Sequence, residues 1–289
     1  TSGNLYFYAS CQDYEDGLSA GSAWFGGAYS KTLAPGTYRV QIEVYDNSGA
    51  LSSWNGGTST CAGSTAITVA GETDSEPLTA KTGVILTGSV TSDKGPVAEG
   101  AVRFYADCAA YEDRAQADYA AIDAGVYTAV LPPSSTYVAW VNPDNGSGAI
   151  DSWHSNEAVC GDAAVISVGP VGPDPQTQDL LAMSGATIMG SVTSSNGPVT
   201  SGQVGFYDSC AAYHDDMGTA YATVENGQYT IDLPAGTYRV EISPDDGQAA
   251  LDSWHSAKAT CAKATVVTVS GDGTVDLVAS PGSLVTGTV

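Results

Sequence analysis

The chain has 289 residues, with 9 Lys and Arg against 32 Asp and Glu and a formal net charge of −23. A surface this acidic repels phosphate backbones and anionic lipid headgroups, which excludes nucleic acids and anionic membranes as partners. No run of 18 apolar residues occurs, so the sequence predicts no membrane insertion.

One pattern of segments occurs three times, with a period of about 100 residues. Each copy opens with an aromatic segment ending in Cys, continues through a Leu/Pro turn into a Thr-Tyr segment, and then reaches a Trp. A second Cys and an alternating apolar segment close the copy. We define repeat 1 as residues 1–80, repeat 2 as 81–182 and repeat 3 as 183–280. Residues 281–289 begin a further copy.

The segments alternate apolar and polar residues and are separated by Gly, Pro, Asn and Asp turns, as in antiparallel strands. This pattern predicts an all-β chain of three tandem Greek-key, seven-stranded, Ig-like β-sandwiches with one disulfide each. Residues 111–125 are expected to form a hairpin. The recurring aromatic residues are expected to fill the cores: Trp54, Trp153, Trp254, Tyr38, Tyr137 and Tyr238.

The six cysteines fall two to a repeat, about 50 residues apart. The repeat therefore predicts three disulfides: Cys11–Cys61, Cys108–Cys160 and Cys210–Cys261. Buried reduced thiols are the alternative, whereas a zinc site lacks the usual Cys-x-x-Cys spacing. Disulfides place the chain in an oxidising, extracellular setting.

Two opening segments followed by a turn, at 83–97 and 185–199, precede an aromatic strand and then a Gly-x-Tyr and Leu-Pro-Ala-Gly-Thr-Tyr segment. Over nearly the whole chain, this order resembles the carboxypeptidase regulatory-like, or prealbumin-like, β-sandwich module of secreted bacterial surface proteins. The resemblance implies a transthyretin-like form of the β-sandwich and an extracellular setting, but no activity. Repeat 1 departs from it by lacking the opening strand.

Few residues suggest site chemistry. The motif Cys-x-x-Tyr-x-Asp places Asp16, Asp113 and Asp215 as Ca²⁺ candidates, with turn capping as the alternative; no other cofactor is expected. Asp151 and His154, repeated as Asp252 and His255, are expected to be turn residues beside a core Trp. No nucleophile recurs with a base, so we expect a non-enzymatic protein.

The two ends of the sequence complement each other. Residues 282–289 match the opening segments 83–90 and 185–192, whereas repeat 1 begins at what is elsewhere the second strand. The residues expected to complete repeat 1 of the next copy are Leu284, Val285, Thr286, Gly287, Thr288 and Val289. They would act either as a donated strand between subunits or as part of a longer covalent array.

The sequence therefore predicts a structural subunit of an extracellular filament, pilus-like fibre or surface stalk, with copies of itself as head-to-tail partners. The alternative is a carbohydrate- or surface-binding adhesin module that binds surface glycans. Trp24 and Trp140 do not recur between repeats, which makes them the candidates for such binding.

Overall fold

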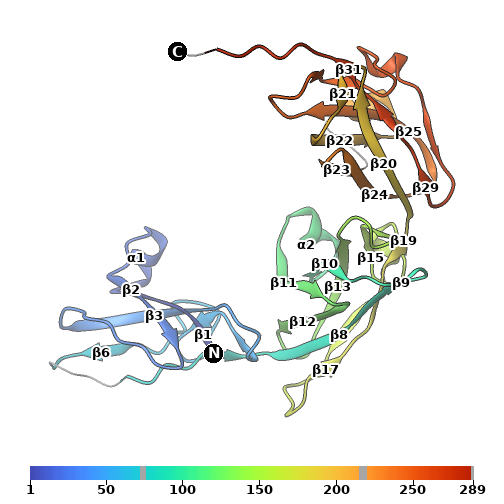
Figure 1. The fold of residues 1–289 in the computed structure, drawn as a ribbon. Coiled ribbons are helices and arrows are strands. Elements are labelled where there is room, and N and C mark those ends of the chain that lie inside the picture. The colour runs from blue at the N-terminus through green and yellow to red at the C-terminus, as the bar shows by residue number, and fades with distance from the viewer. Residues whose placement is uncertain (72–75, 215–219, 288–289) are drawn as a thin grey trace.

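The computed structural model describes residues 1–71, 76–214 and 220–287. Figure 1 shows the three repeats as successive lobes, coloured from blue through green to orange, with the C-terminal segment leaving the third. The described residues are almost entirely strands and turns, with three five-residue helices and two 3-10 turns. Asp215, Thr288 and Val289 lie outside the described residues.

Repeat 1 contains six strands and one helix in its described part. They are β1 (Ser2–Tyr8), α1 (Cys11–Glu15), β2 (Gly21–Gly26), β3 (Gly36–Val44), β4 (Ala50–Leu51), β5 (Ser53–Trp54) and β6 (Ile67–Val69). The main sheet has the order β2-β1-β3-β5, and β6 pairs with the start of β3.

Repeat 2 is larger because it contains an opening strand and its partners. Its elements are β7 (Lys81–Thr82), β8 (Val84–Ser92), β9 (Gly95–Pro96), β10 (Glu99–Tyr105), α2 (Cys108–Glu112), β11 (Gln116–Asp123), β12 (Val126–Leu131), β13 (Ser135–Pro143), β14 (Ala149–Ile150), β15 (Ser152–Trp153), η1 (Cys160–Asp162), β16 (Ile166–Val168), β17 (Gln176–Thr177) and β18 (Leu180–Leu181). Its strands follow the order β15-β13-β10-β11-β12-β8-β17.

Repeat 3 reproduces this arrangement. Its elements are β19 (Met183–Ser184), β20 (Ala186–Ser194), β21 (Gly197–Pro198), β22 (Ser201–Tyr207), α3 (Cys210–His214), β23 (Ala220–Glu225), β24 (Gln228–Leu233), β25 (Gly236–Pro244), β26 (Ala250–Leu251), β27 (Ser253–Trp254), η2 (Cys261–Lys263), β28 (Val267–Val269), β29 (Gly273–Thr274), β30 (Leu277–Val278) and β31 (Ser280–Pro281). The order β20-β24-β23-β22-β25-β27 is that of repeat 2.

The hydrogen bonding differs from that of two separate sheets. In repeat 2, β11 pairs along most of its length with β10, and its last residues, Ile122 and Asp123, pair with β12. The strands of repeat 2 therefore form one continuous hydrogen-bonded sheet, in place of the two separate sheets expected for a sandwich. Residues 111–125 form the expected hairpin strand only from Gln116 onward, because α2 takes up the residues before it.

The N-cap of each of α1 and α2 is the residue just before the Cys, Ser10 or Asp107. The Ser10 hydroxyl accepts a hydrogen bond from Asp13 N at 3.1 Å, and the Asp107 carboxylate accepts one from Ala110 N at 2.8 Å. Such caps satisfy otherwise unpaired amides of the first turn. Asp16 and Asp113 are the C-cap residues of these helices, where the capping bonds are made by their backbone N–H groups and not by the carboxylates that the sequence suggested.

Alternating side chains give the central strands two covered faces. In β1, Leu5 and Phe7 enter the main core of repeat 1, whereas Tyr8 faces a second cluster with Trp54 and Cys61. The core tyrosines Tyr38, Tyr137 and Tyr238 lie in the main cores, but Trp54, Trp153 and Trp254 are buried in these second clusters around the disulfides.

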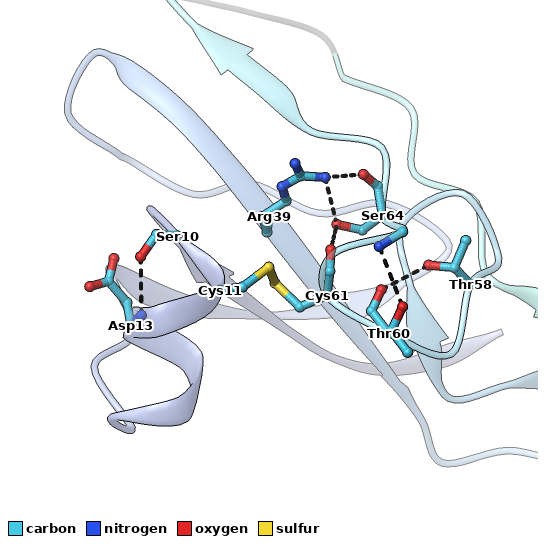
Figure 2. Close-up of a disulfide and its surroundings, with 9 residues drawn as sticks. Ser10, Cys11, Asp13, Arg39, Thr58, Thr60, Cys61 and Ser64 are labelled. Carbon is cyan, nitrogen blue, oxygen red and sulfur yellow. Dashed lines mark hydrogen bonds between the residues drawn. A yellow bond between two sulfur atoms is a disulfide. The ribbon is translucent and has the colours of Figure 1, made fainter.

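The structure contains the three disulfides Cys11–Cys61, Cys108–Cys160 and Cys210–Cys261, with Cα–Cα distances of 5.6, 5.8 and 5.7 Å. Each ties the short helix after the aromatic strand to the loop beyond the Trp. In repeat 1, Arg39 donates hydrogen bonds to the carbonyl and hydroxyl oxygens of Ser64 beside the bridge (Figure 2).

The recurring Tyr of the Cys-x-x-Tyr motif packs on the buried Trp. The rings of Tyr14 and Trp54 meet edge to face with centroids 4.9 Å apart, and the corresponding pairs in repeats 2 and 3 are 4.9 and 4.8 Å apart. The disulfide holds the helix that carries this Tyr over the Trp. The motif is therefore a packing device in every repeat.

Replacing both Cys11 and Cys61 with Ser is expected to lower the free energy of unfolding of repeat 1 by roughly 4 kcal/mol, because the bridge shortens the unfolded chain by a loop of about 50 residues. Equilibrium denaturation in guanidinium, followed by Trp fluorescence, measures the change. The matched control is the Cys210/Cys261 double Ser variant, which should destabilise repeat 3 and leave the transition of repeat 1 unchanged. Equal stability with and without the bridge would contradict the prediction.

Candidate functional site: the repeat joints and the cleft of repeat 1

Each repeat is joined to the next by the same short ladder. β4 pairs with β7 between repeats 1 and 2, and β14 pairs with β19 between repeats 2 and 3. A glycine lies between this ladder and the opening strand of the next repeat: Gly83 N donates to Gly49 O at 2.8 Å, and Gly185 N donates to Gly148 O at 3.0 Å. The two joints therefore have the same backbone geometry.

The joint requires these glycines because neighbouring side chains approach too closely for a Cβ. A Cβ on Gly83 would lie 2.6 Å from a methyl of Val130, and one on Gly185 would lie 2.4 Å from a methyl of Ile150. Both distances are well below ordinary carbon contacts. A residue with a Cβ at either position would therefore force the neighbouring side chain to move.

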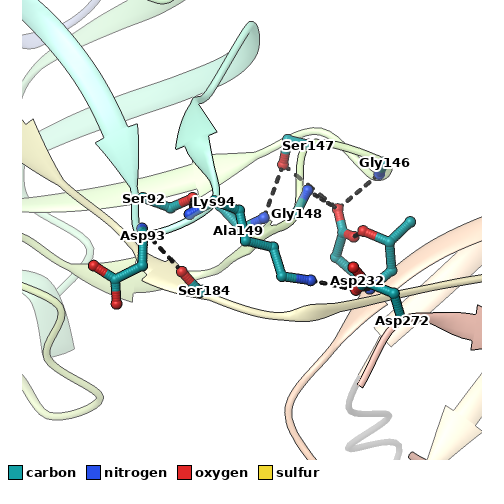
Figure 3. A network of polar contacts seen from close by, with 11 residues as sticks. Ser92, Asp93, Lys94, Gly146, Ser147, Gly148, Ala149, Ser184, Asp232 and Asp272 are labelled. Atoms are coloured by element: carbon teal, nitrogen blue, oxygen red, sulfur yellow. Dashed lines mark hydrogen bonds and ion pairs between the residues drawn. The ribbon is translucent and has the colours of Figure 1, made fainter.

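The joint between repeats 2 and 3 has an additional polar lock, shown in Figure 3. Asp232 of β24 is only 5 % exposed, and its carboxylate accepts hydrogen bonds from Gly146 N at 2.7 Å and Gly148 N at 3.0 Å in the loop of repeat 2. Thr187 of β20 donates its hydroxyl to the other oxygen. Lys94 of repeat 2 forms an ion pair with Asp272 of repeat 3. Charge-assisted bonds of this kind stiffen the joint.

The C-terminal exit of repeat 3 has the geometry of a joint. β26 pairs with β31, and Gly282 N donates to Ala249 O at 3.0 Å, as Gly83 and Gly185 do at the two internal joints. Asn196 donates its side-chain amide to Gly282 O at 2.7 Å. Gly282 therefore leaves repeat 3 with the backbone contact that Gly83 and Gly185 make just before β8 and β20.

Beyond this exit the segment forms no strand in the described residues and is exposed. Val285 is 90 % exposed, whereas the residues at its position in β8 and β20, Leu86 and Ile188, are 0 and 2 % exposed. Leu284 is also exposed. A segment that places an apolar residue on the inward side of a strand is thus left in solvent.

Repeat 1 contains a cleft of about 1200 Å³ where repeats 2 and 3 have β8 and β20. Core-facing side chains line it, among them Leu5, Phe7, Phe25, Ile42 and Ile67. In repeat 2, β8 pairs antiparallel with β12 and parallel with β17 and β18. The matching segments of repeat 1, residues 27–35 and 76–80, form no strand.

The two walls of this cleft are nevertheless held together as in the other repeats. The Tyr29 hydroxyl donates to Glu76 O at 2.7 Å, which matches the bond from Tyr127 to Gln178 O at 2.8 Å and that from Tyr229 to Val275 O at 2.7 Å. Burial raises the pKa of Tyr29, so the hydroxyl keeps its proton. The segments on the two sides of the cleft therefore keep the contact that the complete repeats have between the same positions.

The histidines of the two Asp/His pairs bind the segment that leads to the end of their own repeats. The imidazole Nδ1 of His154 accepts a hydrogen bond from Leu181 N at 3.2 Å, and that of His255 accepts one from Val278 N at 3.4 Å. In repeat 1 the Asn55 side-chain oxygen accepts from Thr79 N at 2.9 Å. Asn55, His154 and His255 therefore fill one structural role, as acceptors of a backbone N–H. The sequence pattern did not reveal this role because Asn and His have only a hydrogen-bond acceptor atom in common.

The other candidate residues lie apart from one another. Trp24 is 60 % exposed, whereas Trp140 stacks on Tyr111 near the disulfide of repeat 2. Within residues 1–71, 76–214 and 220–287, no three His, Cys, Asp or Glu side chains gather as a metal site, so Asp16 and Asp113 have no such partners. None of the helices described is both long and apolar enough to cross a membrane.

No family model matches the chain, and no curated protein matches it in sequence. The resemblance to the carboxypeptidase regulatory-like module therefore stays a prediction. Solved structures with some likeness include a Streptococcal ancillary pilin (12 % identity, TM-score 0.32, 97 % of this chain and 92 % of that one) and the shaft pilin SpaA of Lactobacillus rhamnosus GG (11 %, 0.30, 71 % and 100 %).

A third is the Bacillus anthracis TIE protein (12 % identity, TM-score 0.27), of which this chain, at 97 % of its own length, spans 47 %. The chain thus spans about half the length of that protein. With TM-scores this low, none of these likenesses establishes a shared fold or function.

Replacing Asp232 with Val, the residue at its position in repeat 2, is expected to loosen the second joint. Gly146 N and Gly148 N lose their acceptor, at a cost of roughly 1–3 kcal/mol for buried amides. Hydrogen exchange measured by mass spectrometry should show faster exchange at 145–149. The Asp246→Asn variant, which loses the same charge at an exposed position, should leave the exchange unchanged. Protection at Gly146 and Gly148 in the Val variant would show that Asp232 does not lock the joint.

The free energy of unfolding is expected to fall as the pH falls below about 6.5, because of His154 and His255. Burial lowers the pKa of His154 and His255 from the ordinary 6.5 in the folded protein. The unfolded chain therefore takes up protons first, so the stabilisation is fully present above 6.5 and decreases below it.

Urea denaturation at pH 7.5 and 5.0 measures this effect. The His154→Asn/His255→Asn variant introduces the residue found at the same position of repeat 1, Asn55, and so keeps an acceptor that does not titrate. It should lose less stability between the two pH values than the unmodified chain. Carboxylates contribute equally to both proteins and cancel in the comparison. An identical pH dependence of the two would rule out a role for the histidines.

Proposed function

We propose that the chain is a non-enzymatic structural subunit of an extracellular fibre or surface stalk in which the repeats stack end to end. The observation that carries the proposal is the exit of repeat 3, where Gly282 N bonds to Ala249 O as Gly83 and Gly185 bond at the two internal joints. A further repeat can follow repeat 3 with the backbone geometry that already joins the three present. The disulfides fit an oxidising, extracellular setting.

In this proposal, the cleft of repeat 1 accepts an opening strand with the sequence pattern of residues 283–289. The strand would come from another copy or from a continuous longer chain, and either source gives the same stack. A sandwich that lacks this strand exposes backbone groups and apolar side chains, and β-augmentation covers both. Because the strand and its acceptor lie on different repeats, the contact is heterologous and propagates along an axis.

The register follows from the complete repeats. Gly88 lies opposite Tyr127 in repeat 2 and Gly190 opposite Tyr229 in repeat 3, so Gly287 would lie opposite Tyr29. A Cβ on Gly88 or Gly190 would come within 2.0 or 1.9 Å of the carbonyl oxygen of Gln178 or Val275. Glu76 O occupies that position in repeat 1, so the cleft would accept only glycine there.

Cysteines placed at Ser30 and Thr286 are expected to cross-link copies of the chain head to tail. The corresponding residues of repeat 2, Thr128 and Thr87, lie opposite each other, with hydroxyl oxygens 3.4 Å apart. Mild oxidation of the Ser30→Cys/Thr286→Cys variant should therefore give a ladder of dimers and longer oligomers on a non-reducing gel.

Two variants control this experiment. Ser30→Cys/Leu284→Cys shifts one thiol by two residues along the strand and should give no ladder. Adding Gly287→Val to the Ser30→Cys/Thr286→Cys variant should abolish the ladder, since the side chain would meet the carbonyl of Glu76. Cross-linking that is indifferent to the register or to Gly287 would contradict strand acceptance by repeat 1.

A further inference from the structure

The outer face of the sheet in repeat 1 presents two exposed aromatic rings side by side. Trp24 lies on β2 and Tyr45 directly follows β3; they are 60 and 57 % exposed. Their ring centroids are 6.2 Å apart, with the planes inclined by 35°. Large aromatic rings left together in solvent mark a binding surface more often than an isolated exposed residue does.

A fixed row of polar groups lies across the same face. In the strand register, Asn4 of β1 is opposite Trp24 on one side and Glu43 on the other. The Asn4 amide donates to the Tyr45 hydroxyl at 3.0 Å, and that hydroxyl donates to the Glu43 carboxylate at 2.8 Å. The bond to Glu43 raises the pKa of Tyr45, so its hydroxyl stays protonated.

The other repeats do not share this arrangement. The residues at the positions of Trp24, Asn4, Glu43 and Tyr45 are Ala121, Ala101, Asn142 and Asp144 in repeat 2, and Thr223, Gln203, Ser243 and Asp245 in repeat 3. Both repeats fold into the same sheet with these smaller residues. The aromatic and polar groups of repeat 1 are therefore not needed for the fold.

A recess continues from this face toward repeat 2. Tyr45 lines a cavity of about 350 Å³ between the two repeats, together with Lys81, Asp118 and Tyr119. Tyr119 is itself 50 % exposed, and Arg103 lies over its ring at 5.7 Å. An extended ligand can thus contact the Trp24–Tyr45 pair and the recess at the same time.

We propose that this surface of repeat 1 binds a neutral oligosaccharide. The apolar faces of its sugar rings pack on Trp24 and Tyr45, and its hydroxyls bond the amide of Asn4 and the carboxylate of Glu43, which offer donors and acceptors together. The recess takes the next sugar of the chain. A net charge of −23 and the carboxylate in the row disfavour anionic glycans. Binding would place an adhesive site on the side of the fibre subunit.

The test is a printed array of neutral and anionic oligosaccharides probed with the fluorescently labelled chain, followed by calorimetric titration with the best soluble ligand. Trp24→Ala and Glu43→Ser are the test variants, because repeats 2 and 3 carry Ala121 and Ser243 at these positions and fold with them. Each should weaken binding by about tenfold or more, the equivalent of a lost stacking contact or hydrogen bond. Val165→Ala, at an exposed position of repeat 2, should bind normally.

Thermal melting of the two variants checks that repeat 1 remains folded. Neutral glycan binding that depends on both residues supports the proposal. The proposal is overturned if no neutral glycan on the array binds, if binding is confined to anionic glycans, or if folded Trp24→Ala binds as tightly as the unmodified chain. Head-to-tail cross-linking is measured separately, so failure here leaves the stacking proposal unaffected.

Discussion

The opening strand is the element on which each repeat depends. In repeats 2 and 3 it pairs with one strand on one side and with two short segments on the other, and it buries Leu86 or Ile188 in the core. It also runs from one joint to the next, so it carries the connection between neighbouring repeats. Residues 81–83 and 183–185, just before it, form the joint ladders, so core closure and stacking are provided by one continuous stretch of chain.

Repeat 1 shows which parts of the fold depend on this strand, because its described residues contain no counterpart of β8 or β20. The segments that flank it elsewhere, at 27–35 and 76–80, have no strand partner and form no strand, although Tyr29 still ties them together. The rest of the sheet keeps its order and its disulfide cluster. Strand formation at the cleft is thus a consequence of pairing, whereas the disulfide side of the repeat is independent of it.

The two described joints use different chemistry for the same geometry. Val130 and Leu51 pack around Gly83 at the first joint, whereas Asp232 binds loop amides at the second. The two amide hydrogen bonds that the Asp232 carboxylate accepts across the joint are directional, so they restrict the angle between repeats more than apolar contacts do. The residue of repeat 1 at the position of Val130 and Asp232 is Thr32. A repeat stacked before repeat 1 would therefore meet a hydroxyl there, in place of a methyl group or a carboxylate.

The sequence alone determined the elements that depend on local pattern and on repetition. Alternation predicted strands, and the position of two cysteines in each repeat led to three bridges that the structure contains. The match of 282–289 to the opening segments pointed to a strand without a partner. Only the tertiary structure decided which partners meet across long distances: that β11 links β10 to β12 in one sheet, that the tryptophans cover disulfides and not the main cores, and that Asn55, His154 and His255 accept the same hydrogen bond, one in each repeat. The physical reason is that a strand's period specifies which side chains share a face, whereas its neighbours are selected by packing between residues far apart in the chain.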